Sequence, residues 1–388
     1  MSYVNVSSNA FPFLDELKAA KPELNGLISE IQGELNLRLW HQLCVHLIEL
    51  SENKDLHTGS NLINLYNNVI YSIEPAFNPM KIMIILQNVI KNFHGRLDDA
   101  LVFLGDIEKR LKPQGEEYFY MQCLKADCLL GLNKLYECHE ILKEVKVALE
   151  KLFDVDHMVY SYFYKLFSHY YDKKQNYDEF YNYALQYFAY CKEENIKQEE
   201  KLHLCYKMAL ASLIGEKMFN FSELLEKEYF KVLIDSQYEW IYNLIRSIST
   251  GKVDQFVNMV ANYKTNFEQE VALVNKKEFL ETKVRIAALL NLIFQKNKNE
   301  RTITFNEIIN VCFCNSNQVE IISMKALSLG LIKGHINEVD KQLVVTWIQP
   351  NFLEREKLTL LHDRLEQWIK KTNNLLGDFE EQSKKIIH

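Results

Sequence analysis

The chain has 388 residues, a length that allows a sizeable core and two or three domains. Glycine (12) and proline (6) are scarce, while Lys and Arg (45) and Asp and Glu (52) are interspersed and leave a formal net charge of −7. Such a balance gives no field that attracts polyanions, which argues against nucleic-acid partners. The sequence has no basic start followed by an apolar stretch and no apolar run approaching ~18 residues, so we expect no signal peptide and no membrane span.

Helix-period patterns occupy most of the chain up to residue 300. Residues 1–22 contain two prolines and show little periodicity, so we expect a loosely ordered N-terminus there. Over 23–300, apolar residues recur at helical spacing, and tight turns divide them into antiparallel pairs of ~34 to 47 residues. Such pairs in series are typical of tetratricopeptide or HEAT-like solenoids, although no strict repeat consensus is present. The last helix is expected over 267–294, and 295–301 is the best linker candidate.

The segment 301–350 departs from this pattern. It begins with a short helical piece at Thr304–Asn310, followed by a polar turn. Glu320 lies three residues after Asn317, at the spacing of a capping box, where a second helix is expected to begin. The apolar stripe of that helix consists of Val319, Ile322, Ala326 and Leu329. Gly330 stands where a left-handed helix stop is expected.

After Gly330 the hydrophobic period changes to two. A strand is expected at Ile332–Ile336, a polar turn after it, and a second strand at Leu343–Ile348. Helix, turn, helix and hairpin, in this order, predict a winged helix. The fold class is therefore an all-α solenoid of TPR/HEAT-like antiparallel helix pairs over 23–300, then a winged helix over 301–350 and a C-terminal helix after it.

The second strand of the hairpin is apolar on both faces. Strict alternation puts Leu343, Val345 and Trp347 on one face and Val344, Thr346 and Ile348 on the other. A two-stranded sheet is too small to bury both faces, and the outer edge of this strand would carry unpaired backbone groups. We therefore expect a partner chain to dock there, by strand addition or side-by-side packing. The alternative is that the first helix of the motif and the C-terminal helix cover the strand.

Residues 351–388 form the last part, a helix and a tail. Its apolar stripe is spaced alternately three and four residues apart, a heptad seam made of Leu358, Leu361, Leu365, Trp368, Thr372, Leu375 and Phe379. Two interpretations stay open for the part up to Leu365, which either folds back on the winged helix or meets a partner. From Trp368 onward we expect a partner helix. The candidate interface residues here are Leu365, Trp368, Leu375 and Phe379.

No familiar catalytic or metal motif is present in the sequence. The patterns of phosphate-binding loops, dinucleotide folds, serine hydrolases, zinc proteases and EF-hands are all missing. The cluster of Cys123, Cys128, Cys138 and His139 contains no CxxC pair, and small buried thiols explain it better than zinc. We expect no catalytic residue, no cofactor and no metal. The eight cysteines are expected to be reduced, in a cytoplasmic and nuclear protein.

A winged helix often binds DNA, but the charges of this one argue against it. Its cations and anions sum to zero: Arg301, Lys325, Lys333 and Lys341 against Glu307, Glu320, Glu338 and Asp340. Neutralising phosphates requires several net cations on one face. We therefore expect neither nucleic acid nor membrane among the partners.

Five short stretches resemble one family. They are Leu39–Leu43, Phe219–Leu225, Met324–Gly334, Glu338–Lys341 and Thr346–Pro350. In this order they resemble the PCI-domain non-ATPase subunits of the 26S proteasome regulatory-particle lid, those numbered nine in yeast naming and thirteen in mammalian naming. The first 30 residues, the 51–60 loop and the tail after residue 376 carry no such markers.

The resemblance implies that the winged helix over 301–350 forms a PCI domain with the preceding helices, in a structural subunit that serves ubiquitin-dependent protein degradation. Other PCI subunits of the lid would be partners through the winged helix, and a helical bundle of lid subunits would be a partner through the C-terminal helix. The alternative within the same class is a PCI scaffold of another assembly, the COP9 signalosome or a translation initiation complex. Neither the contacted partner residues nor any ubiquitin contact follows from the sequence.

Overall fold

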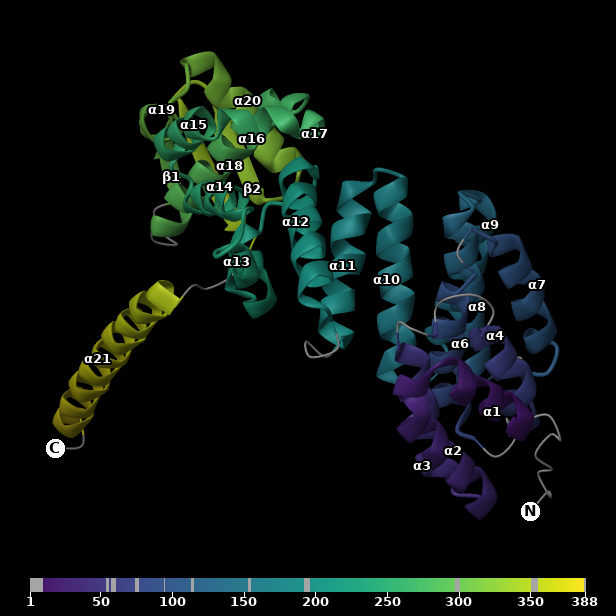
Figure 1. Ribbon diagram of the computed structural model, residues 1–388. Helices are drawn as coiled ribbons and strands as arrows, with labels where there is room; N and C mark the ends of the chain where they lie inside the picture. Colours follow the sequence, from purple (N-terminus) through teal and green to yellow (C-terminus); the bar gives the residue numbers. More distant parts are fainter. Residues whose placement is uncertain are drawn as a thin grey trace. The chain divides into compact units, whose positions relative to one another are not determined.

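The computed structural model is almost entirely helical, with one small sheet near the C-terminus (Figure 1). The residues it describes are 10–53, 56, 61–73, 77–93, 95–112, 115–152, 155–191, 196–296, 301–349 and 355–386. None of the described helices is long and apolar enough to cross a membrane. The expected helical array followed by a winged helix is confirmed, and the chain divides into two compact units.

Unit 1 comprises Met1–Gln175 and Tyr183–Lys192. Its helices are α1 (Ala10–Ala20), α2 (Asn25–Leu37), α3 (Trp40–Glu52), α4 (Asn61–Leu65), α5 (Tyr71–Ile73), α6 (Pro79–Lys91), α7 (Leu97–Glu108), α8 (Glu116–Gly131), α9 (Leu135–Leu149) and α10 (His157–Lys173). A π-helical turn, Tyr66–Ile70, joins α4 to α5. Consecutive helices pair, as in α2 with α3 and α8 with α9, while α3, α6, α8 and α10 contact one another in succession. This succession makes one layer of unit 1.

The N-terminal segment differs from the sequence prediction. Residues 10–20, expected to be loosely ordered, form α1, and Ala10, Leu14 and Leu17 are buried at i, i+4 and i+7 on one face. Helix α1 has only 11 residues, and three buried positions are too few to make a helical period evident in the sequence. Residues 1–9, and residues 297–300 of the expected linker, lie outside the described part of the chain.

Unit 2 comprises Asn176–Asn182 and Glu193–His388, so that α11 (Tyr177–Tyr190) is divided between the two units. Its further helices before the sheet are α12 (Gln198–Ile214), α13 (Phe221–Glu226), α14 (Glu239–Thr250), α15 (Val253–Asn262), α16 (Lys264–Gln269), α17 (Val271–Val274) and α18 (Lys277–Gln295). A 3-10 helix, Glu228–Leu233, follows α13. Helix α14 packs against α12, α15 and α18, and α15 also packs against α18.

The single long helix expected over 267–294 is instead three helices, α16, α17 and α18. The chain leaves the helical conformation at Glu270, whose backbone is extended (φ −94°, ψ 91°). The Tyr206 hydroxyl of α12 donates a hydrogen bond of 2.6 Å to Oε1 of Glu270. A local helical pattern does not reveal a contact between distant segments, and for this reason the break at Glu270 was not predicted from the sequence.

Lys283 ties α18 to the end of α12. Its side chain is 1% exposed, and Nζ donates to the carbonyl oxygens of Ser212 at 2.6 Å, Leu213 at 3.3 Å and Gly215 at 2.7 Å. These are carbonyls at a helix C-terminus, which have no partner within the helix. The amine also lies 5.1 to 5.6 Å from the ring centres of three phenylalanines, Phe219, Phe221 and Phe279. Hydrogen bonds and ring faces together offset part of the cost of burying a cation.

The winged helix contains β1 (Thr302–Thr304), α19 (Phe305–Cys312), α20 (Ser316–Ser328), β2 (Ile332–Asn337) and β3 (Gln342–Ile348). The sheet has three antiparallel strands in the order β1-β3-β2, with β3 in the centre. The expected two-stranded sheet is therefore wrong. The strand β1 is only three residues long and pairs solely with distant β3, which leaves no local pattern in the sequence.

Both helices of the motif begin at capping boxes. Thr304 and Glu307 bond reciprocally, with the Thr304 N–H donating to Oε2 of Glu307 at 3.0 Å. At α20 the box uses Asn315 and Gln318, not the expected pair two residues later, because the backbone of Asn315 is still extended and the helix begins at Ser316. The left-handed stop at Gly330 is present, with φ 71°.

The core of the winged helix is shared with α18. Buried apolar residues of α18 join those of the motif: Ile286, Ala288, Leu289 and Ile293 meet Ile303, Phe305, Ile308, Cys312, Cys314, Val319, Ile322, Ala326, Leu331, Ile332, Leu343, Val345 and Ile348. Helix α18 thus covers the core of the winged helix and, through Lys283, also binds the C-terminal end of α12. The last helix, α21 (Arg355–Ile386), follows the sheet.

Candidate protein-interaction surfaces

A bulge in β3 decides which side chains of the wing face outward. Lys333 pairs with Trp347 and Gly334 pairs with Val345, so Thr346 is an extra residue on β3. The Thr346 hydroxyl donates to the carbonyl oxygen of Lys333 at 3.0 Å. A Cβ on Gly334 would lie 2.0 Å from the Val344 carbonyl oxygen, so the strands can approach this closely only because residue 334 is a glycine.

The bulge corrects the predicted faces of β3. Strict alternation puts Trp347 with Leu343 and Val345, whereas the extra residue turns Trp347 outward and Ile348 inward. Val345 is 4% exposed and Ile348 is 7% exposed, while Trp347 is 40% exposed. Val344 is half-buried and Thr346 is exposed. The strand therefore has one apolar inner face rather than two apolar faces.

The outward side of the hairpin, which we name the wing face, consists of Lys333, His335, Val344, Thr346 and Trp347. The ammonium of Lys333 lies 5.1 Å from the ring centre of Trp347 on the paired strand. Opposed residues of an antiparallel pair share one face, which brings these two together. The wing face thus combines an aromatic surface with a cation that the ring already engages.

The backbone groups available for strand addition belong to β2, not to β3. Strand β1 occupies the other side of β3 from Gln342 to Val344, and the Val345 N–H donates to the Arg301 carbonyl oxygen at 2.9 Å. Strands β1 and β2 each pair on one side only, so both are edges of the sheet. The longer open edge is that of β2, Ile332–Asn337, and an added strand would lie beside it.

Helix α20 presents an uncharged stripe that the sequence analysis did not single out. Asn317, Ile321, Met324 and Ser328 follow one another at i, i+4, i+7 and i+11, and all are exposed; we name this stripe the α20 face. Ile321 is 57% and Met324 is 54% exposed. The signal was available, because both residues are out of phase with the buried stripe. Leu329, expected to belong to the buried stripe, is exposed instead because the helix ends at Ser328.

The heptad seam of α21 is exposed over its described length. Side chains are described for residue 359 and residues 361–380, and every one of them is exposed. The candidate interface residues Leu365, Trp368, Leu375 and Phe379 are between 48% and 71% exposed. Exposed apolar stripes of this length on a single helix mark contact surfaces. The position of Leu358 in the seam lies outside the described side chains.

The chemistry of the remaining polar groups is that of packed side chains. No group of three His, Cys, Asp or Glu in the described part of the chain has the geometry to hold a metal ion. Burial raises the pKa of Cys128, Cys138 and Cys312 to about 12, which keeps these thiols protonated. In the winged helix, the Lys325 ammonium lies 5.2 Å from the ring centre of Phe279. Lys325 of α20, the helix that would enter a DNA groove in a DNA-binding winged helix, therefore lies against a ring of α18.

Two family models match this chain. The model described as PSD13 N-terminal repeats matches residues 27–245, and the model of the PCI domain matches residues 260–347. The chain belongs to the PSD13 family. The PCI match ends inside β3 and begins in α15, so it combines the winged helix with the helices packed against it.

Named relatives of this PSD13-family chain are similar along nearly their whole length. The "26S proteasome non-ATPase regulatory subunit 13" of Dictyostelium discoideum is 28% identical over 97% of this chain and 98% of that protein. Its homolog A from Arabidopsis thaliana is 28% identical over 97% of this chain and 99% of that protein. The "Probable 26S proteasome regulatory subunit rpn9" of Schizosaccharomyces pombe is 26% identical over 98% and 99%.

Proposed function

We infer that this chain is a structural, non-catalytic subunit of the regulatory-particle lid of the 26S proteasome, in ubiquitin-dependent protein degradation. Membership of the PSD13 family and the full-length similarity to regulatory non-ATPase subunits support the assignment to this assembly rather than to another PCI scaffold. The relatives are named for regulation and not for catalysis. Such a subunit works in the cytoplasm and the nucleus, where the proteasome does.

The observation that carries the scaffold role is the exposed seam of α21. Between residues 365 and 379 the seam presents four large apolar side chains, on a helix whose described side chains make no buried core. Helices with such a seam pack against other helices by inserting side chains between those of the partner. We propose that α21 joins a bundle of lid subunits through Leu365, Trp368, Leu375 and Phe379.

The winged helix would supply the second contact. The open edge of β2, the wing face and the uncharged α20 face surround the motif with surface that suits neighbouring PCI domains and offers no phosphate-binding field. Of the predicted residues, Val344, Thr346 and Trp347 would touch a partner. Val345 and Ile348 would act from within, by holding the strand in place. The boundaries 23–300, 301–350 and 351–388 remain our proposal for the functional division of the chain.

The test is incorporation of a truncated chain into the lid. A chain that ends before Trp368 keeps unit 1 and keeps unit 2 up to residue 367, and it loses most of the seam. We expect its thermal unfolding midpoint to match that of the full chain, and its co-purification with tagged lid subunits to fall at least about tenfold, since several large side chains leave the interface. A matched control replaces exposed polar residues of α21, Glu366→Gln with Lys370→Gln, and should assemble normally. Normal assembly of the truncated chain would refute the bundle role.

A further inference from the structure

Unit 1 contains a pocket that the scaffold role does not use. It lies in the layer of α6, α8 and α10, beside the start of α7, and has a volume of about 390 Å³. Its lining combines apolar residues, among them Ile90, Leu97 and Leu124, with the polar residues Lys91, Asp127 and Tyr162. The volume falls within the range of ligand sites, ~300 to 1,000 Å³. We name it the α8 pocket.

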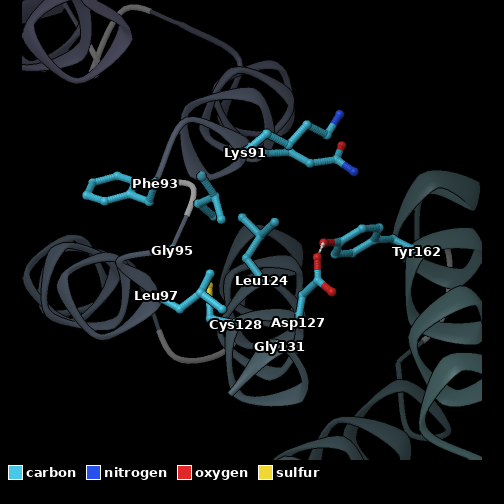
Figure 2. A pocket seen from close by; sticks show the side chains of 11 residues that line it. Lys91, Phe93, Gly95, Leu97, Leu124, Asp127, Cys128, Gly131 and Tyr162 are labelled. Carbon is cyan, nitrogen blue, oxygen red and sulfur yellow. Dashed lines mark hydrogen bonds between the residues drawn. The ribbon is translucent and has the colours of Figure 1, made fainter. Parts of the chain in front are cut away.

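The floor of the α8 pocket is apolar and its wall carries a fixed carboxylate. Figure 2 shows Leu97 and Leu124 side by side at the centre, with Asp127 toward Tyr162. The Tyr162 hydroxyl donates to Oδ2 of Asp127 at 2.9 Å. Tyr162 is buried while Asp127 is exposed, so the phenol anchors one oxygen and leaves the other oxygen toward solvent. A carboxylate held in this way is oriented in advance for a ligand.

The carboxylate of Asp127 has no cationic partner in the part of the chain that the structure describes. Its one hydrogen bond comes from Tyr162, a neutral donor. Lys91, the cation in the lining, donates instead to Oδ1 of Asn88 at 3.1 Å, and Figure 2 shows it on the opposite rim. After burial, the negative charge of Asp127 is the next cause that raises the pKa of Cys128 and of Tyr162. The charge of Asp127 therefore acts on both of these neighbours.

We propose that the α8 pocket binds a basic side chain, arginine or lysine, of an extended segment of a partner protein. The alkyl stem would lie on Leu97 and Leu124, and the cationic head would donate to the outward oxygen of Asp127. The volume exceeds that of one such side chain and admits an apolar neighbour in the segment. Charge complementarity with Asp127 selects a cationic occupant over a neutral or anionic one.

The proposal is independent of the lid role, because it concerns the isolated chain. The probe is the blocked dipeptide acetyl-Leu-Arg-amide, compared with its lysine, citrulline and glutamate counterparts. Binding is followed through the methyl NMR signals of isotope-labelled Ile, Leu and Val residues. We expect the arginine and lysine peptides to shift the signals of Ile90, Leu97 and Leu124, and the citrulline and glutamate peptides to leave them in place.

Two variants of Asp127 isolate the charge. Asp127→Asn keeps an acceptor for Tyr162 and should weaken binding of the arginine peptide at least about tenfold, as expected for a hydrogen bond to a charged group. Asp127→Lys should instead bind the glutamate peptide. Asp254→Asn, which changes an exposed carboxylate on α15, is the matched control and should bind like the unaltered chain. Equal affinity of the Asp127→Asn variant, shifts confined to other methyl groups, or no shifts at millimolar peptide would each overturn the proposal.

Discussion

Gly334 and Thr346 act together at the residue scale. The extra residue on β3 requires the two backbones to approach, and the approach leaves no room for a Cβ at position 334. By contrast, Gly33 in the interior of α2 has nothing within 4 Å of the position of a Cβ. The two glycines therefore predict opposite effects of the same substitution.

We expect Gly334→Ala to destabilise the winged helix by about 2 kcal/mol, because the strands must separate to relieve the clash with the Val344 carbonyl oxygen. Gly33→Ala should instead stabilise by about 0.5 to 1 kcal/mol, since alanine is the better helix former. Thermal unfolding midpoints of both variants check the prediction. A Gly334→Ala variant as stable as the parent chain would mean that the bulge is not as close as described.

Lys283 is the second residue whose environment makes a prediction. Burial lowers its pKa from 10.5 to about 7; the charge of Lys276 acts in the same direction, and the charge of Asp178 opposes it. The three carbonyls and three ring faces around the amine also favour the charged form. The lowered pKa means that the folded chain binds fewer protons than the unfolded chain between about pH 7 and about pH 10.5.

From this difference the free energy of unfolding should rise with pH above about pH 7. Lys283→Met removes the titrating group and keeps the volume. We therefore expect the stability of the parent chain, relative to this variant, to increase from about pH 6 to about pH 8.5. Urea titrations of both chains at several pH values measure it. Parallel pH curves would show that the carbonyls and rings hold the amine charged throughout.

At the scale of the element, β3 has a buried side and an exposed side. Val345 is buried against α18, whereas Trp347 faces outward. Val345→Asp should unfold the winged helix or lower its stability by several kcal/mol, because an unpaired charge enters the core. Trp347→Asp should leave the thermal midpoint nearly unchanged and weaken co-purification with lid subunits. Circular dichroism and pull-down on the same samples separate the two effects.

A stable Val345→Asp chain would contradict the inner position of that side chain. Trp347→Phe is the control for the outer position, since it keeps an aromatic ring for Lys333 and for a partner. If Trp347→Asp lost its fold as completely as Val345→Asp, the wing face would be structural and not a contact surface.

The sequence predicted elements that carry their own periodicity and missed those that depend on distant contacts. The strand bounds 332–336 and 343–348 were within one residue of β2 and β3, and the stop at Gly330 was correct. The strand β1 and the break at Glu270 were missed, because each exists through a partner more than 35 residues away. Strand β1 pairs with residues 38 to 42 positions further along the chain, and Glu270 lies 64 residues after Tyr206.

The candidate contact surfaces were partly predictable for the same reason. Alternation alone placed Trp347 on the same face as Leu343 and Val345, since no local pattern reveals an extra residue whose position is set by pairing with Gly334. The α20 face was not predicted as a contact surface, although its residues lie at helical spacing. The described part of the α21 seam, from Leu361 to Phe379, was predictable as an apolar stripe, because a heptad is a property of the helix itself.

At the scale of the whole molecule, the cysteines report how well the core is closed. Seven of the eight are buried, and Cys191 is half-buried. Thiolates are the reactive form, and burial both blocks access and raises the pKa of Cys123, Cys128 and Cys138. Under native conditions a thiol reagent should therefore label one cysteine rapidly, and all eight after denaturation. Mass spectrometry of the labelled chain counts the modified thiols. Rapid labelling of several thiols in the native chain would indicate a looser core.

The shared use of α18 limits how the molecule can be divided in the laboratory. A fragment cut at residue 301 would leave Ile303, Leu343 and Val345 without the helix that covers them, and it should precipitate or stay unstructured. A fragment that begins at Gln198 retains α12, the Lys283 anchor and α18 together. Expression trials with these two starting points would locate the smallest soluble piece.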